Sequence, residues 1–180
     1  MERTDTKKSL TVRQPKDTEL FTYISDKQAI RLLKDAVKAR KQAQYPNIPQ
    51  DYLTCHNYEG KTANGLTRCV IDYINSQEDC HAERISNEGV MRTDKNGKSF
   101  RATSSMTNGT ADIHATIVGR SVKFEIKIGR DVQSAEQKQY QQDIENAKGY
   151  YLIVRNFEEF LTWFLPKMEQ IKAKKGVKSE

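Results

Sequence analysis

The sequence has no long apolar run and is poor in apolar residues overall. Its hydrophobic fraction is 36% and its mean hydropathy is −0.81. No stretch approaches the roughly 18 apolar residues that a membrane span needs, and the first ten residues, MERTDTKKSL, lack the apolar stretch of a secretory signal. We therefore expect no membrane association, and a small hydrophobic core beneath a well-charged surface.

Cysteine is scarce as well, with only Cys55, Cys69 and Cys80 in the chain. An odd number of this size does not suggest a disulfide framework, so we expect a reducing, cytoplasmic setting. The pairs Cys55-His56 and Cys80-His81 match no zinc-finger or zinc-ribbon spacing, and no zinc site is predicted. Cys69 falls on an apolar helical stripe, and we expect it in the core.

The net charge of +6 is unevenly distributed along the chain. Residues 1–50 hold 11 basic against 6 acidic side chains, and residues 166–180 hold 5 against 2. Residues 51–165 hold 14 against 16, so the centre is mildly acidic. Basic ends suit a polyanion such as nucleic acid, and an acidic centre can gather carboxylates around a cation. Solubilising tails are the alternative that charge alone leaves open.

Three sections are predicted along the chain: a basic, partly helical N-terminal extension (1–60), a core domain (61–166) and a basic, frayed C-terminal tail (167–180). In the extension, Ser25 and Gln28 form a capping box for a helix that runs to about Gln44. Its apolar face is thin, consisting of Ile30, Leu33 and Val37. Pro46 and Pro49 then end helical structure and suggest a linker.

The core domain alternates between helical and extended patterns. We predict a helix over 62–77, a short strand over 80–85, a long loop over 87–108 with a strand near Phe100, and a hairpin over 111–128. Ser134 and Gln137 open a further helix whose buried stripe is Tyr140, Ile144 and Ala147. The apolar run 150–154 predicts an interior strand, and Asn156 caps a last helix with an aromatic face. This order indicates an α/β fold with a central mixed β-sheet flanked by helices.

The hairpin is the most informative segment. Ala111, Ile113, Ala115 and Ile117 alternate with polar residues before a tight turn at Gly119-Arg120. Val122, Phe124, Ile126 and Ile128 then alternate with Lys123, Glu125 and Lys127. A period of two places Glu125 and Lys127 on one largely polar face of the sheet.

Hydrolysis of a phosphodiester needs hard oxygen ligands for a divalent cation and a positive group near the attacking water. Asp112 and Glu125 lie on consecutive strands and can converge on one cation, with the backbone carbonyl of Ile126 as a third ligand. Lys127 would then stand beside the water, and Gln137 could reach the same point from the next helix. The alternative interpretation is a cross-strand salt bridge on a solvated sheet face.

Residues 109–154 resemble the core of the PD-(D/E)xK nuclease superfamily, and more narrowly its VRR-NUC type, which is similar to Holliday-junction resolvases. The resemblance rests on Gly109 with Asp112, on Glu125-Ile126-Lys127, on Ser134 with Gln137, and on Gly149 followed by YYLIV. It extends over about residues 62–165 and implies a restriction-endonuclease-like core. Ala111 stands where many relatives have proline. Relatives often carry a further metal-binding Glu on the first core helix, and neither Asp72 nor Glu78 matches it.

The resemblance implies a DNA endonuclease that depends on Mg²⁺ or Mn²⁺, either selective for branched DNA or general, and acting as a homodimer. A catalytically silent nucleic-acid-binding protein with the same fold is the alternative function. Arg84, Lys98 and Arg101 are candidate phosphate contacts, although each suits a surface cation equally. His114, on the same strand face as Asp112, suits a solvated position better than a role beside the water.

Overall fold

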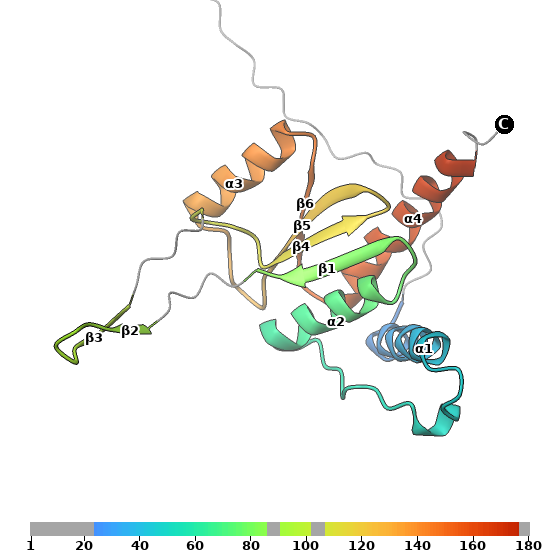
Figure 1. Cartoon of the computed structure of the whole chain (residues 1–180). Helices are drawn as coiled ribbons and strands as arrows, with labels where there is room; N and C mark the ends of the chain where they lie inside the picture. The colour runs from blue at the N-terminus through green and yellow to red at the C-terminus, as the bar shows by residue number, and fades with distance from the viewer. Residues whose placement is uncertain (1–23, 86–90, 102–106, 177–180) are drawn as a thin grey trace, which may run out of the picture.

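The computed structural model describes residues 24–85, 91–101 and 107–176 (Figure 1). In chain order its elements are α1 (Asp26–Gln44), the 3₁₀ turn η1 (Gln50–Tyr52), α2 (Ala63–Asn75), β1 (Cys80–Arg84), β2 (Met91–Thr93), β3 (Ser99–Arg101), β4 (Ile113–Ile117), β5 (Arg120–Ile126), α3 (Ala135–Asn146), β6 (Tyr150–Val154) and α4 (Phe157–Gly176). No helix among these is long and apolar enough to cross a membrane.

The main sheet has the strand order β1-β4-β5-β6. β1 and β5 both run antiparallel to β4, whereas β6 runs parallel to β5. The predicted α/β class, a central mixed sheet flanked by helices, is therefore confirmed. β2 and β3 form a separate two-stranded sheet inside the segment that we predicted as a long loop. The strand predicted near Phe100 is β3, whereas β2 was not predicted.

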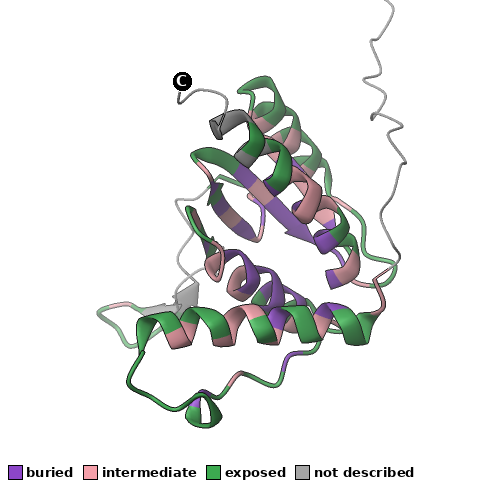
Figure 2. Ribbon diagram, turned by 90° about the vertical axis from the view of Figure 1, so that its right-hand side faces the viewer, coloured by how far each residue is buried: buried purple, intermediate pink, exposed green. Residues whose placement is uncertain are grey.

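Alternate residues of β5 face two different layers. Val122, Phe124 and Ile126 join the core under α2 and α4, where the Phe124 ring meets that of Phe160 edge to face at 5.6 Å. Glu125 and Lys127 lie on the opposite face, on the side where α3 crosses the sheet (Figure 1). Figure 2 shows the strands and the inner side of α2 as the buried part of the molecule. One strand thus contributes to both the hydrophobic core and a polar layer.

Helix α1 belongs to the same core. It begins after Ser25, whose N–H donates to Gln28 Oε1 at 2.9 Å, as the predicted capping box requires. Ala29 and Leu33 are fully buried as α1 packs on α2 and α4. Leu53 and Tyr58, in the connection that follows, are buried too. Ala29 and Leu33 of α1, together with Tyr58, therefore belong to the same hydrophobic core as the residues of the predicted core domain.

The C-terminal boundary also differs from the prediction. The predicted frayed tail is wrong for residues 167–176, which continue α4 past Pro166. Met168 is buried against the core, and its Sδ lies 4.0 Å from Cys80 Sγ. This contact holds α4 against the core at Met168, beyond Pro166.

Three local predictions need correction. The hairpin turn is Val118-Gly119, both at positive φ, which is the geometry of a two-residue type I′ turn; Arg120 already begins β5. Helix α3 has no fully buried stripe, since Tyr140 and Ile144 are half-buried and Ala147 is exposed. Within the described sheet, β6 is an edge strand rather than an interior one. Its continuous apolar run reflects helices on both faces, because α3 and α4 both contact it.

Candidate active site

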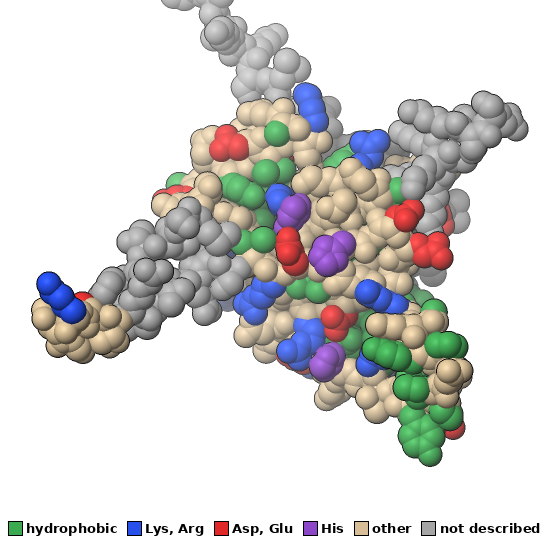
Figure 3. Space-filling model, viewed as in Figure 1, with side chains coloured by type: hydrophobic (Ala, Val, Ile, Leu, Met, Phe, Trp, Pro, Cys, Tyr) green, Lys and Arg blue, Asp and Glu red, His purple; other side chains and the backbone are tan. Residues whose placement is uncertain are grey.

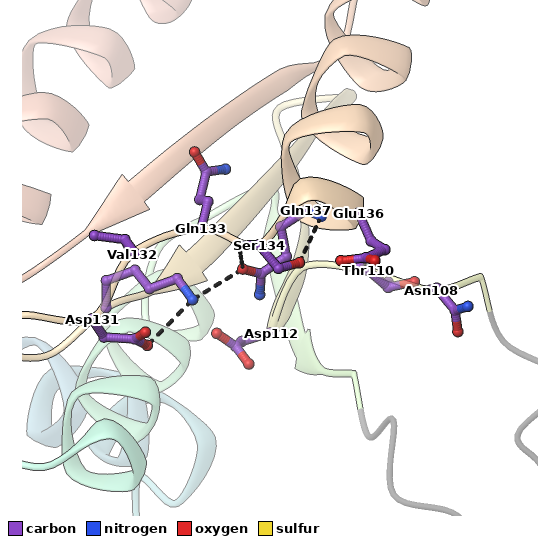
Figure 4. A pocket seen from close by; sticks show the side chains of 11 residues that line it. Asn108, Thr110, Asp112, Asp131, Val132, Gln133, Ser134, Glu136 and Gln137 are labelled. Atoms are coloured by element: carbon purple, nitrogen blue, oxygen red, sulfur yellow. Dashed lines mark hydrogen bonds and ion pairs between the residues drawn. The ribbon is translucent and has the colours of Figure 1, made fainter.

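A cavity of about 580 Å³ opens at the end of the sheet where β5 leaves it and β4 begins. Asp112, Lys127 and Gln137 all line it, three of the four side chains predicted to be catalytic. The remaining lining residues are Asn108, Gly109, Thr110, Asp131, Val132, Gln133, Ser134 and Glu136. Figure 4 shows Asp112, Asp131 and Gln137 around the same space.

Asp112 lies one residue before β4, and its carboxylate bridges to β5. Its Oδ2 accepts the N–H of Ile126 at 2.8 Å, while its main-chain carbonyl accepts the N–H of Ile85 at 2.8 Å. The N–H and C=O of one strand residue point to the same side, so the carbonyl of Ile126 is also directed toward the Asp112 side. The predicted carboxylate and carbonyl ligands are therefore neighbours.

Glu125 and Lys127 form a buried ion pair. Their residues are only 1% and 5% exposed, and Lys127 Nζ lies 3.2 Å from Glu125 Oε1. Tyr151 donates its hydroxyl to the other carboxylate oxygen, Oε2, at 3.2 Å. The alternative of a salt bridge on a solvated face does not describe this pair, because α3 and Tyr151 shield it from water. Burying two charges is costly unless both are fully paired, which these partners achieve.

Gln137 connects the two charges through a single amide. Its Nε2 donates to Glu125 Oε1, and its Oε1 accepts from Lys127 Nζ at 3.0 Å. The same Oε1 accepts the N–H of Ser134 at 2.9 Å, and Ser134 Oγ accepts the N–H of Gln137 at 3.2 Å. The capping box that begins α3 thus also fixes the amide orientation at the site. This explains how one short motif serves both structure and chemistry.

Asp131 is a site residue that sequence reasoning missed. Its Oδ2 lies 3.2 Å from Lys127 Nζ, and its side chain remains 58% exposed at the cavity. Tyr151 was missed as well, although its position in β6, paired with Lys123, places it on the Glu125 face. The period of two could have identified Tyr151. No pattern could have identified Asp131, because it lies in an irregular loop.

Gly109 allows the segment before Asp112 to pass close to helix α3. Its φ is +74°, and a Cβ at this position would lie 2.4 to 2.6 Å from main-chain atoms of Glu136 and Gln137. Backbone atoms cannot move aside as a side-chain end can, so any larger residue would displace the segment or the helix. The close approach holds Asp112 and Gln137 on opposite walls of one cavity.

The charges of the site alter one another's pKa values. Burial raises the pKa of the Glu125 carboxyl and the nearby Asp112 charge raises it further, by more than the bonds from Lys127 and Tyr151 lower it. Burial lowers the pKa of Lys127, but its hydrogen bonds to Glu125 and Asp131 outweigh this effect and leave the pKa above its usual range. The two carboxylates therefore repel each other in the protein alone, and a cation between them would relieve that repulsion.

The donor chemistry of the site fits a hard divalent cation. Asp112, Glu125 and the Ile126 carbonyl offer only oxygen, which Mg²⁺ prefers. Among the described residues, no group of three or more His, Cys, Asp or Glu side chains is arranged to hold a metal ion. The set proposed here has two carboxylates and one main-chain oxygen, so it would depend on additional oxygens from water or substrate. Partial coordination of this kind is usual for Mg²⁺.

The other predicted residues lie away from the cavity. Arg84 is exposed at the end of β1, and Lys98 is exposed in the β2–β3 turn. Arg101 lies on β3, and its side chain is outside the described part of the structure. His114 Nδ1 lies 3.7 Å from Glu83 Oε1 on the open face of the sheet. Asp72, considered as a further metal ligand, instead accepts the Tyr58 hydroxyl at 2.8 Å.

Two comparisons with known proteins, one with family models and one with curated sequences, find no relative. No protein-family model matches the chain, and a search of curated proteins finds no significant match. The function of the chain is therefore inferred from the geometry of the site.

Proposed function

We propose that this protein is a divalent-metal-dependent endonuclease with a restriction-endonuclease-like core that hydrolyses phosphodiester bonds in DNA. The observation that carries the proposal is the buried Glu125–Lys127 pair, joined by Gln137 and placed beside Asp112 at an open cavity. A buried, fully bonded ion pair contributes little net stability compared with apolar residues. Its position at a cavity wall is therefore better explained by chemistry than by folding.

In this proposal, Asp112, Glu125 and the Ile126 carbonyl would hold Mg²⁺ or Mn²⁺. Such a cation, when bound, neutralises phosphate charge and lowers the pKa of a water molecule. Asp112 lines the cavity and would contact an entering cation before Glu125, which is not among the lining residues. The raised pKa of the Glu125 carboxyl supports this assignment, because a cation would stabilise the charged form that burial disfavours.

Lys127 would orient the attacking water and stabilise negative charge that develops on the phosphate. Its ammonium is held by Glu125, Asp131 and Gln137, so it reaches the cavity in one defined position. The pKa shift keeps it positively charged at neutral pH. Preorganised charge of this kind contributes more than a mobile surface lysine, since no reorganisation is needed during the reaction.

Two finer proposals rest on the resemblance of residues 109–154. The substrate would be branched DNA, and the protein would act as a homodimer, because two active sites are needed to address two strands or arms. Cleavage of single-stranded, duplex and four-way DNA with Mg²⁺ or Mn²⁺ tests the first. The oligomeric state in solution tests the second.

The central experiment compares metal-dependent stability with cleavage. We expect Mn²⁺ to raise the melting temperature of the wild type by linkage, relative to EDTA. Asp112→Asn should lose both cleavage and most of this metal effect while remaining folded. Lys127→Met should lose cleavage and keep the metal effect, since its ammonium is not assigned to the cation. Glu83→Gln, which removes an exposed carboxylate outside the cavity, is the control and should retain both.

The results separate the proposal from its alternative. Metal-independent melting together with an absence of cleavage on every substrate would contradict the nuclease assignment. DNA binding without cleavage at any metal concentration would instead support a catalytically silent nucleic-acid-binding protein.

A further inference from the structure

The β2–β3 hairpin projects from the body of the protein. Figure 1 shows it apart from the main sheet and the helices, and no other described helix or strand packs extensively against it. Its turn is well defined: Asp94 Oδ1 accepts the N–H groups of Asn96 and Lys98, each at 2.9 Å. The side chains of Lys95 and Lys98 are exposed at this turn. The hairpin is thus a formed element with no structural role in the described core.

The charge of the hairpin is opposite to that of the cavity. Residues 91–101, which we call the basic hairpin, contain four basic residues against one acidic residue. Among the described residues, three carboxylates and the ammonium of Lys127 line the cavity. Without a bound cation, a polyanion that entered the cavity would meet net negative charge from these side chains, so positive charge elsewhere on the protein would raise its affinity.

The segment that contains the basic hairpin is attached beside the candidate active site at both of its ends. Ile85, the last described residue before it, donates its N–H to the carbonyl of Asp112, and Asn108 lines the cavity just after it. Each connecting stretch, 86–90 and 102–106, has five residues and can span at most about 20 Å. Covalent geometry therefore keeps the base of the hairpin near the site.

We infer that the basic hairpin is a DNA-binding element that contacts backbone phosphates beside the cavity through Lys95 and Lys98. A duplex carries about one phosphate charge per 1.7 Å of its axis, so about 20 Å of duplex next to the site presents about a dozen phosphates. A two-stranded ribbon is also narrow enough to enter the major groove. The inference rests on the proposed function for its choice of partner, because the chemistry at the cavity is what indicates DNA.

The test measures salt-dependent binding of a labelled 30-base-pair duplex without turnover. All proteins carry Asp112→Asn, so that the DNA is not consumed. Lys95→Ala/Lys98→Ala is compared with the control Lys27→Ala/Lys61→Ala, which removes the same charge from exposed positions on and near α1 and α2. Each phosphate contact contributes about 0.9 to the slope of log affinity against log salt. We expect the hairpin variant to lose about 2 from this slope, and the control to lose none.

The readouts distinguish this inference from the nuclease proposal. Because phosphate contacts carry no sequence information, the loss should be similar for duplexes of different sequence. An unchanged slope in the hairpin variant, or equal losses in the hairpin and control variants, would overturn the inference even if the wild type cleaves DNA. A reduced slope of log affinity against log salt in the hairpin variant, but not in the control variant, would uphold the inference even if no cleavage were found. Thermal unfolding of each variant verifies that the fold is intact, and Lys95→Gln/Lys98→Gln repeats the charge removal with side chains of nearly the original length.

Discussion

One face of the main sheet carries two charged clusters that differ in their exposure to water. At one end, Glu125 and Lys127 lie 3.2 Å apart with side chains 2% and 7% exposed. Toward the β1 edge, which we call the open end, Glu83 and His114 lie 3.7 Å apart with side chains 59% and 33% exposed. Figure 3 shows histidine, acidic and basic side chains gathered on this open part of the sheet.

The strands do not explain this difference. Lys123 and Glu125 lie on one face of β5, Lys127 follows directly after the strand, and Lys123 pairs with His114 in the register. The first turn of α3 and the Tyr151 hydroxyl contact Glu125, whereas Glu83 and His114 remain partly exposed. The comparison shows that a covering helix converts a common strand pattern into a desolvated site in which charges act strongly.

Removing the carboxylate should be far more costly at the buried end. Glu125→Ala leaves the Lys127 ammonium buried with only Asp131 as a charged partner, and we expect a loss of about 3 kcal/mol or more in unfolding free energy. Glu83→Ala should cost less than about 1 kcal/mol, because its partner stays solvated. Urea unfolding followed by Trp163 fluorescence gives both values. Equal losses would show that α3 does not desolvate the site.

Gly109 and Gly119, both at positive φ, provide a steric comparison. Gly109 (φ +74°) contacts the backbone of α3, whereas nothing lies within 4 Å of a Cβ placed on Gly119 (φ +78°). Both alanine variants incur a similar conformational cost of about 1 kcal/mol. Gly109→Ala should lose about 2 kcal/mol more through overpacking, and it should also reduce any metal-dependent stabilisation. Similar stabilities of the two variants would contradict the close approach of this segment to α3.

The buried end should make the metal-free protein less stable as pH rises. The folded-state pKa of Glu125 is raised, so the folded protein binds more protons than the unfolded chain between the ordinary glutamate pKa and the raised one. The contribution of Glu125 to the free energy of unfolding is therefore fully present below its ordinary pKa and is lost as the pH rises through its folded-state pKa. Glu125→Gln should remove this slope. Chemical unfolding in EDTA across that pH range measures it, and a slope that persists in the variant would assign it to another group.

The open end should produce a smaller effect of opposite sign. Burial lowers the pKa of His114, Lys123 and His81 lower it further, and Glu83 opposes them. The unfolded chain then binds more protons just below the ordinary histidine pKa, so stability falls as pH falls in that range. His114→Gln should reduce this loss slightly, because the residue is partly solvated. An increased acid sensitivity in the variant would show that the Glu83 partner dominates instead.

Local sequence signals predicted much of this structure because their causes are local. The capping residues Ser25 and Ser134 mark helix starts, since their side chains or main-chain N–H groups satisfy neighbouring helix-terminal groups. The period of two in the hairpin predicted which residues of β4 and β5 face the core. Cys69, on the apolar stripe of α2, is fully buried as predicted. Each of these signals depends on residues within a few positions of one another.

Errors occurred where distant parts of the chain meet. The position of β6 at the sheet edge, the helical course of residues 167–176 and the integration of α1 all depend on packing partners remote in sequence. Tyr151 reaches Glu125 from a strand 26 positions away, and Asp131 reaches Lys127 from an irregular loop. A period of two can place Tyr151 on one face of β6, but no local period encodes that β6 pairs with β5 or that Asp131 reaches Lys127.

Periodicity and capping, which are short-range properties of the chain, predicted the helices and the hairpin. The resemblance of residues 109–154 favoured the set Asp112, Glu125, Lys127 and Gln137 over a plain salt bridge, and hydrogen bonds and an ion pair connect Glu125, Lys127 and Gln137 in the structure. The burial of Glu125 and Lys127 and the partial exposure of Glu83 and His114 depend on tertiary contacts. The cause is desolvation, because the interaction energy and the pKa of a charged group depend on how far it is shielded from water. The groups that shield Glu125 come from α3 and β6, which follow the hairpin in the chain.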